Sequence, residues 1–148
     1  MSFDYSLFIA WGNYHFAVRD FQNSRKSFLY ALKQYEEIGK VRHHPDAAAC
    51  LYKIGRVALE EGDLNDAIEI FRESIRRLRS ADPMSSQLGR VRFMLCKALR
   101  TMGVENTDEI SQLEKEIRDL VQALRPQQDL SAEISEALLD SLVRGIIR

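Results

Sequence analysis

Small residues recur in this sequence at a nearly fixed interval, and that interval limits the folds open to the chain. Gly12, Gly55 and Cys96 lie 43 and 41 residues apart, each inside a segment of helical periodicity. A large apolar residue follows each of them at a matching offset, with one inserted residue in the third case: Phe28, Phe71 and Leu113. A small side chain lets a neighbouring helix approach closely, and the large one fills the remaining space. The interval therefore predicts an array of stacked helix pairs.

Apolar residues recur at three- and four-residue steps along nearly the whole chain, which indicates amphipathic helices. Proline and glycine are scarce, at three and seven, and no Asn-Gly or Asp-Gly hairpin signal occurs, so no sheet is expected. Caps and stops are predicted at Asp63, at Asp82-Pro83 and at Gly103. The predicted helices span about 3–18, 23–38, 45–61, 64–79, 83–103 and 107–124, with a seventh running from Asp129 or Ser131 to the C-terminus.

The composition is that of an ordinary soluble domain: 148 residues, 45% hydrophobic, 29% charged and a net charge of -1. This charge does not favour nucleic acid or a membrane surface as a partner. No apolar run is long enough to span a bilayer, and the N-terminus lacks a basic start, so a cytoplasmic location is predicted. Cys50 and Cys96 form no CxxC motif, and we expect reduced thiols.

The residues in register resemble the tetratricopeptide repeat family. Residues 48–81 match its pattern best, with Ile54-Gly55, Gly62, Ala67 and Phe71. Residues 5–38 match well through Trp11-Gly12, Phe28 and Ala31-Leu32, and residues 89–124 are a degenerate third copy. The long period is similar to that of the long-helix branch found in kinesin light chains and the bacterial maltose regulator. The resemblance implies an all-α, right-handed superhelix of three helix pairs over residues 1–126. Apolar spacing predicts a C-terminal amphipathic helix over residues 127–148.

The resemblance also implies a concave inner face, lined by the first helix of each pair and used to bind peptides. Helical spacing projects a mostly basic and aromatic set onto that face: Asn13, Tyr52, Arg56, Arg90, Phe93, Lys97 and Arg100. Such a surface suits a protein or peptide partner with acidic and apolar anchors. We therefore predict a non-catalytic interaction scaffold. The alternative is a solvated helix face with snorkelling arginines.

Other binding chemistry has weaker support in the sequence. Some family members clamp the acidic tails of chaperones, but that clamp is incomplete here because Ile9 and Phe93 stand where lysines are expected. Eight basic residues between Arg72 and Arg100 are compatible with phosphate binding. The acidic segment 105–119 is expected to face them, so nucleic acid is not expected as a partner.

No enzyme signature is present: there is no Ser-His-Asp spacing, Gly-rich phosphate loop or HExxH motif. His43 and His44 are interpreted as polar loop residues, because adjacent histidines rarely bind one metal and no further ligand supports them. His15 is interpreted as a core histidine, and Cys96 as a packing residue. We predict no catalytic residues, no metal and no cofactor.

The last predicted helix has a single apolar stripe, formed by Leu130, Ile134, Leu138, Leu142 and Ile146. One interpretation is a cap that covers the third helix pair. The alternative is a self-associating module, a homodimer joined through this helix. The residues predicted for that contact are Leu138, Leu139, Leu142 and Ile146.

Overall fold

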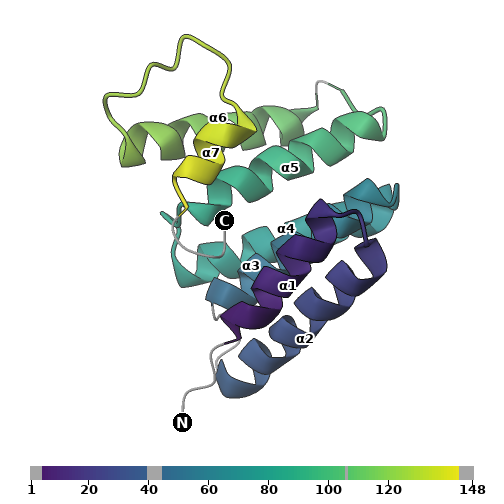
Figure 1. Cartoon of the computed structure of the whole chain (residues 1–148). Coiled ribbons are helices and arrows are strands. Elements are labelled where there is room, and N and C mark those ends of the chain that lie inside the picture. The colour runs from purple at the N-terminus through teal and green to yellow at the C-terminus, as the bar shows by residue number, and fades with distance from the viewer. Residues whose placement is uncertain (1–4, 40–44, 106, 144–148) are drawn as a thin grey trace.

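The computed structural model describes residues 5–39, 45–105 and 107–143, and every regular element within them is an α-helix. Their bounds are α1 (Ser6–Ala17), α2 (Phe21–Gly39), α3 (Pro45–Glu60), α4 (Leu64–Ala81), α5 (Gln87–Thr101), α6 (Asp108–Leu124) and α7 (Glu136–Ser141). The helices α1 to α6 pack in chain order as three hairpins (Figure 1). The predicted all-α array of helix pairs is confirmed.

Small residues lie at the contact between the two helices of each hairpin, as the sequence interval predicts. A Cβ atom on Gly12 would lie 2.4 Å from Cε1 of Phe28, and one on Gly55 would lie 2.6 Å from Cε1 of Phe71. In the third hairpin Cys96 and Leu113 are buried in one cluster. There a larger residue replaces glycine and a smaller one replaces phenylalanine, so the two changes in volume offset each other.

The turn inside each hairpin uses a left-handed residue at the equivalent position. Gly62 and Gly103 end α3 and α5 with φ of 81° and 92°. Arg19 takes the same position after α1 with φ of 62°. A non-glycine residue is strained there, because its Cβ approaches the following carbonyl. Equivalent positions of the repeat therefore share a backbone conformation as well as a residue pattern.

The fifth helix begins later than predicted. Asp82 and Pro83 do not start α5 but lie in the turn before it: Asp82 Oδ1 accepts a hydrogen bond from the Met84 N–H at 2.9 Å. The N–H of Ser85 donates to the Asp82 carbonyl at 3.0 Å, and α5 starts only at Gln87. A local side-chain turn at Asp82 therefore takes the place of the expected helix cap.

The seventh helix is much shorter than predicted, and neither Asp129 nor Ser131 caps it. Asp129 Oδ1 accepts from the Ser131 N–H at 2.8 Å, which closes a turn, and residues 125–135 are not helical. Ser135 is the true cap, because its hydroxyl accepts from the Leu138 N–H at 3.1 Å. Residues beyond 143, including Ile146, lie outside the described part of the chain.

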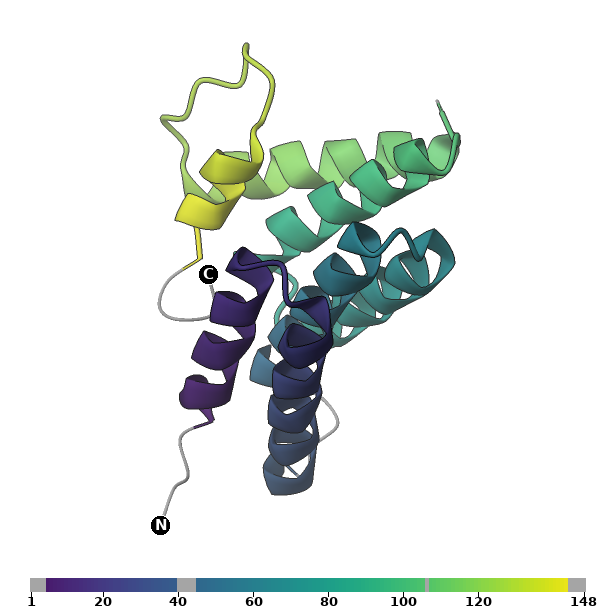
Figure 2. The same cartoon turned by 45° about the vertical axis from the view of Figure 1, so that its right-hand side comes forward.

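The two ends of the array differ. At one end α7 packs on α5, and its residues join a hydrophobic cluster with α6 (Figure 1). At the other end α1 lies at the edge of the molecule (Figure 2). Its partners among the described helices are chiefly in α2. Among the described residues, the array is therefore covered by further parts of the chain at the α7 end only.

Candidate functional site

Tyr52 of α3 lies at the centre of the predicted binding face. Its ring is fully buried, and the guanidinium carbon of Arg90 lies 4.5 Å from the ring centroid. Arg56 lies 6.0 Å from the same ring and 5.1 Å from the ring of Phe16. Stacking on aromatic faces orders both arginines. We call Tyr52 and Arg56 of α3, with Arg90 and Phe93 of α5, the α3–α5 surface.

Helix α7 covers much of the α3–α5 surface with acidic side chains. Glu136 Oε1 lies 3.3 Å from Arg56 Nη2, and Asp140 Oδ1 lies 4.0 Å from Arg90 Nη1. Between them Leu139 is fully buried. Leu139 reaches this depth because Gly89 has no side chain: a Cβ on Gly89 would lie 3.0 Å from Leu139 Cδ2. The predicted surface is therefore occupied by the chain's own helix and is not an open groove.

Two further predicted residues of α5, Phe93 and Arg100, lie near α6 and the segment that precedes α7. Phe93 is half-buried and packs against the cluster of Ile117 and Ile134. Arg100 is exposed and forms an ion pair with Glu114 of α6. Phe93 and Arg100 line one cavity of about 150 Å³. Lys97 is exposed on α5. The structure thus brings Phe93 and Arg100 together and leaves Lys97 at the surface.

Asn13 lies on α1 in a different neighbourhood from the α5 residues. It is half-buried and shares a cavity of about 20 Å³ with Phe16, Phe28, Lys53 and Arg56. This space is about large enough for one water molecule. Asn13 is therefore adjacent to Arg56 and lies at the α1 border of the predicted face.

Lys53 is a buried basic residue that the sequence interpretation missed. It is 7% exposed, and its Nζ lies 6.0 Å from the Tyr52 ring centroid. Burial, together with the nearby charges of Arg90 and Arg56, lowers the pKa of Lys53 to about 7. The sequence signal that could have identified Lys53 was its position directly after Tyr52 and three residues before Arg56.

The predicted self-association residues pack within this chain. Leu139 is buried, and Leu138 and Leu142 are half-buried in the same cluster as Val121 of α6. This arrangement matches the cap interpretation of the last helix. The fourth predicted residue, Ile146, is outside the described residues.

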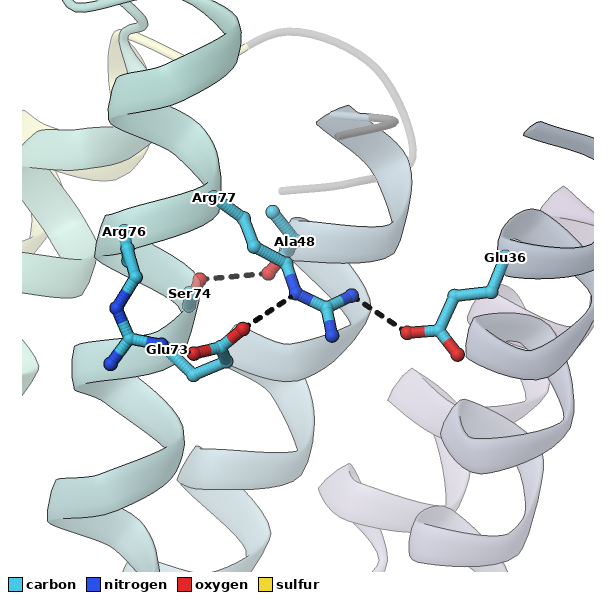
Figure 3. Close-up of polar contacts among 6 residues, drawn as sticks. All are labelled: Glu36, Ala48, Glu73, Ser74, Arg76 and Arg77. Atoms are coloured by element: carbon cyan, nitrogen blue, oxygen red, sulfur yellow. Dashed lines mark hydrogen bonds and ion pairs between the residues drawn. The ribbon is translucent and has the colours of Figure 1, made fainter. Parts of the chain in front are cut away.

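The basic run between Arg72 and Arg100 is largely paired with carboxylates. Arg77 of α4 reaches Glu36 of α2 at 2.6 Å and Glu73 at 2.9 Å (Figure 3). The acidic helix α6 faces the same run, as predicted: Glu109 pairs with Arg72 at 3.0 Å, and Glu116 pairs with Arg92 at 3.0 Å. These pairs reduce the field available to a phosphate backbone.

Residues with nucleophilic or ligand chemistry are poorly placed for catalysis. Burial raises the pKa of Cys50 to about 12 and that of Cys96 to about 11, so both thiols stay protonated at neutral pH. His15 is half-buried rather than in the core, and it stacks on Trp11 with 5.8 Å between ring centroids. No group of three potential metal ligands occurs among the described residues. His43 and His44 are outside them.

Comparison with known families agrees with this geometry. The Tetratricopeptide repeat profile matches residues 5–80, which contain α1, α2, α3 and all but the last residue of α4. The chain belongs to the tetratricopeptide repeat family. Tetratricopeptide repeat domains typically mediate protein–protein interactions. No curated protein matches the sequence. Among the described helices of this tetratricopeptide repeat protein, none is long and apolar enough to cross a membrane.

The acidic residues of α7 are the other site residues that sequence reasoning missed. Glu136 and Asp140 are four residues apart and flank Leu139, so they share one helical face. That spacing is visible in the sequence. Its meaning depended on knowing that α7 folds back onto the tetratricopeptide repeats.

Proposed function

We propose that the chain is a non-catalytic protein-interaction module whose α3–α5 surface binds an acidic amphipathic helix. In this proposal α7 is the resident occupant, and a partner helix competes with it. The observation that supports the proposal is how α7 packs on this surface. Glu136 pairs with Arg56, Asp140 pairs with Arg90, and Leu139 is buried between the two pairs. The partner would present an acidic residue, a leucine three residues later and an acidic residue at the next position.

The chemistry of the surface supports such a ligand. Arg56 and Arg90 stack on the ring of Tyr52, so a ligand gains charge-assisted contacts without having to order those side chains. Arg90 is 1% exposed, and an opposite charge offsets the cost of burying its guanidinium. Gly89 provides a notch for one branched apolar side chain. Charge and shape together favour a helix over an extended acidic tail.

The covered state has a regulatory consequence. A partner helix gains access only when α7 leaves, so the apparent affinity falls in proportion to the fraction of open molecules. The Arg56–Glu136 pair is partly exposed and contributes little by itself. Burial of Leu139 contributes more, on the order of 2 kcal/mol. Leu139 is therefore the position at which to open the surface.

The test uses the full chain and a labelled peptide with the sequence of residues 130–143. Leu139→Asp places a carboxylate at a buried position and should release α7. We expect the peptide to bind this variant at least roughly tenfold more tightly than the unaltered chain. Met84→Asp makes the same charge change at an exposed apolar residue and should bind like the unaltered chain. Glu136→Lys is a second opening variant if Leu139→Asp does not fold.

Two further measurements assign the binding to the proposed surface. In the opened variant, Arg56→Glu together with Lys97→Glu should abolish peptide binding while far-UV circular dichroism stays unchanged. A peptide with lysine in place of Glu136 should also lose affinity. If both opened variants fold and neither binds the peptide, the proposal is wrong. It is equally wrong if binding survives the double substitution.

A further inference from the structure

The hydroxyl of Tyr52 is a buried polar group without a hydrogen bond. The side chain has an exposed fraction of 0%, and its oxygen forms no hydrogen bond with any of the described residues. A hydroxyl that is removed from water destabilises the folded state unless another group replaces the water. The α3–α5 surface, as α7 covers it, therefore leaves one polar group unsatisfied at its centre.

The two acidic residues of α7 approach their arginines to different distances. Glu136 Oε1 lies 3.3 Å from Arg56 Nη2, whereas Asp140 Oδ1 lies 4.0 Å from Arg90 Nη1. A charge-assisted hydrogen bond between such groups is about 2.7–2.9 Å long, so the contact of Asp140 with Arg90 is an ion pair without a hydrogen bond. The two acidic residues are one helical turn apart on one face, and the shorter side chain makes the longer contact.

Asp140 lies close to the Tyr52 hydroxyl as well as to Arg90. The guanidinium carbon of Arg90 lies 4.5 Å from the Tyr52 ring centroid. Burial raises the pKa of the Tyr52 hydroxyl, and the negative charges of Asp140 and Glu136 act on it in the same direction. The Asp140 side chain is 38% exposed, so there is space for a longer one. One more methylene adds a bond of about 1.5 Å, which exceeds the shortfall at Arg90.

We propose that the partner helix carries glutamate where α7 carries Asp140, and that this one carboxylate binds both Arg90 and the Tyr52 hydroxyl. This inference rests on the proposed function of the α3–α5 surface and specifies its ligand: an acidic residue, a leucine three residues later, and glutamate directly after the leucine. The guanidinium N–H and the phenolic O–H both donate to the carboxylate, so both polar groups are satisfied. A partner can then displace α7 without a larger interface, because α7 makes the weaker contact.

The first test uses the full chain and needs no partner. Asp140→Glu should slow hydrogen exchange of the α7 amides roughly tenfold, because the added hydrogen bonds hold α7 on the surface. Tyr52→Phe alone should not accelerate that exchange, because the hydroxyl that it removes has no partner. In a chain with both substitutions, most of the tenfold gain should be lost. Asp140→Gln is the matched control, with the length of glutamate and its helix propensity but no charge, and it should not slow exchange. An equal effect of glutamine and glutamate would overturn the proposal.

The second test measures binding of the labelled peptide of residues 130–143 to the opened Leu139→Asp chain. A peptide with Asp140→Glu should bind roughly tenfold more tightly than the unaltered peptide, and Tyr52→Phe in the chain should cancel most of that gain. Equal affinities of the two peptides, or a gain that survives Tyr52→Phe, would overturn this inference, while the proposed function stands because the unaltered peptide binds. If neither peptide binds the opened chain, the proposed function fails, and the exchange measurement still decides whether the surface prefers the longer carboxylate.

Discussion

Phe71 lies against the bare Cα of Gly55, so close that a Cβ on Gly55 would sit 2.6 Å from the phenylalanine ring. Phe28 and Gly12 repeat this relationship one hairpin earlier, with 2.4 Å. The third hairpin has Cys96 and Leu113 at these positions. The molecule therefore contains two solutions to one packing problem, and they can be exchanged experimentally.

Gly55→Ala should destabilise the chain although alanine is the better helix former. The helix propensity gained is about 1 kcal/mol, and overpacking against Phe71 costs about 2–3 kcal/mol. We expect a net loss of about 1–2 kcal/mol in the free energy of unfolding, measured by urea denaturation. Adding Phe71→Leu, which copies the third hairpin, should make the double variant more stable than the sum of the single effects predicts. Strict additivity would contradict this interpretation.

Arg19→Gly should stabilise the chain. Arg19 is the only described non-glycine residue with positive φ, at 62°, while its counterparts Gly62 and Gly103 adopt such angles freely. Relief of that strain should raise the free energy of unfolding by about 1 kcal/mol. The ion pair with Glu60 at 3.8 Å is exposed and contributes little. Gly62→Ala is the reciprocal change and should lower the melting temperature. A drop in melting temperature for Arg19→Gly would show that its side-chain contacts outweigh the strain.

Lys53 should make stability depend on pH in a recognisable window. Burial lowers its folded pKa to about 7, well below the value of 10.5 for a solvated lysine. Between these values the unfolded chain holds more protons, so the free energy of unfolding should rise with pH. We expect Lys53 to contribute a rise of about 1–2 kcal/mol from pH 7 to 9. Lys53→Met should remove it, and Lys33→Met, at an exposed position, should not. Parallel curves for Lys53→Met and the unaltered chain would refute the assignment.

The cysteines should be unreactive while the chain is folded. Burial raises the pKa of both Cys50 and Cys96, to about 12 and 11, so little thiolate exists at pH 8. Reaction with a thiol-specific disulfide reagent should therefore be slow, and urea should accelerate it to the rate of a free thiol. Rapid labelling of either cysteine without denaturant would show that its helix opens locally.

Much of the fold follows from local chemistry that the sequence displays. Gly12 and Gly55 mark the hairpin contacts, and Gly62 marks a turn, because glycine best suits a close approach or a positive φ. Charge alone also indicated that the acidic segment 105–119 faces the basic run, which the pairs of Arg72 and Arg92 with α6 confirm. These features depend on neighbours within one or two helices, which the repeat register supplies.

The candidate site was harder to predict from the sequence, because it depends on contacts that lie outside the repeat pattern. The path of residues 125–135 is set by the Asp129 turn and by Arg118, whose Nη1 donates to the Leu130 carbonyl at 3.0 Å. Helical periodicity cannot reveal either contact. His15 was expected in the core because it occupies the position that the repeat family usually fills with a packed tyrosine. Its counterparts Ala58 and Leu99 are indeed buried. It is half-buried because no preceding hairpin covers α1 in the described chain.

The connection formed by residues 125–135 has a consequence for how α7 competes. It ties α7 to the end of α6 by a short stretch of chain, so α7 meets the α3–α5 surface at an effective concentration on the order of millimolar. Weak contacts suffice to keep the surface covered under those conditions. A free helix with the same residues would lose this competition. The arrangement therefore sets an affinity threshold. Only a helix that binds more tightly than α7, or a partner that presents several such helices, would displace α7.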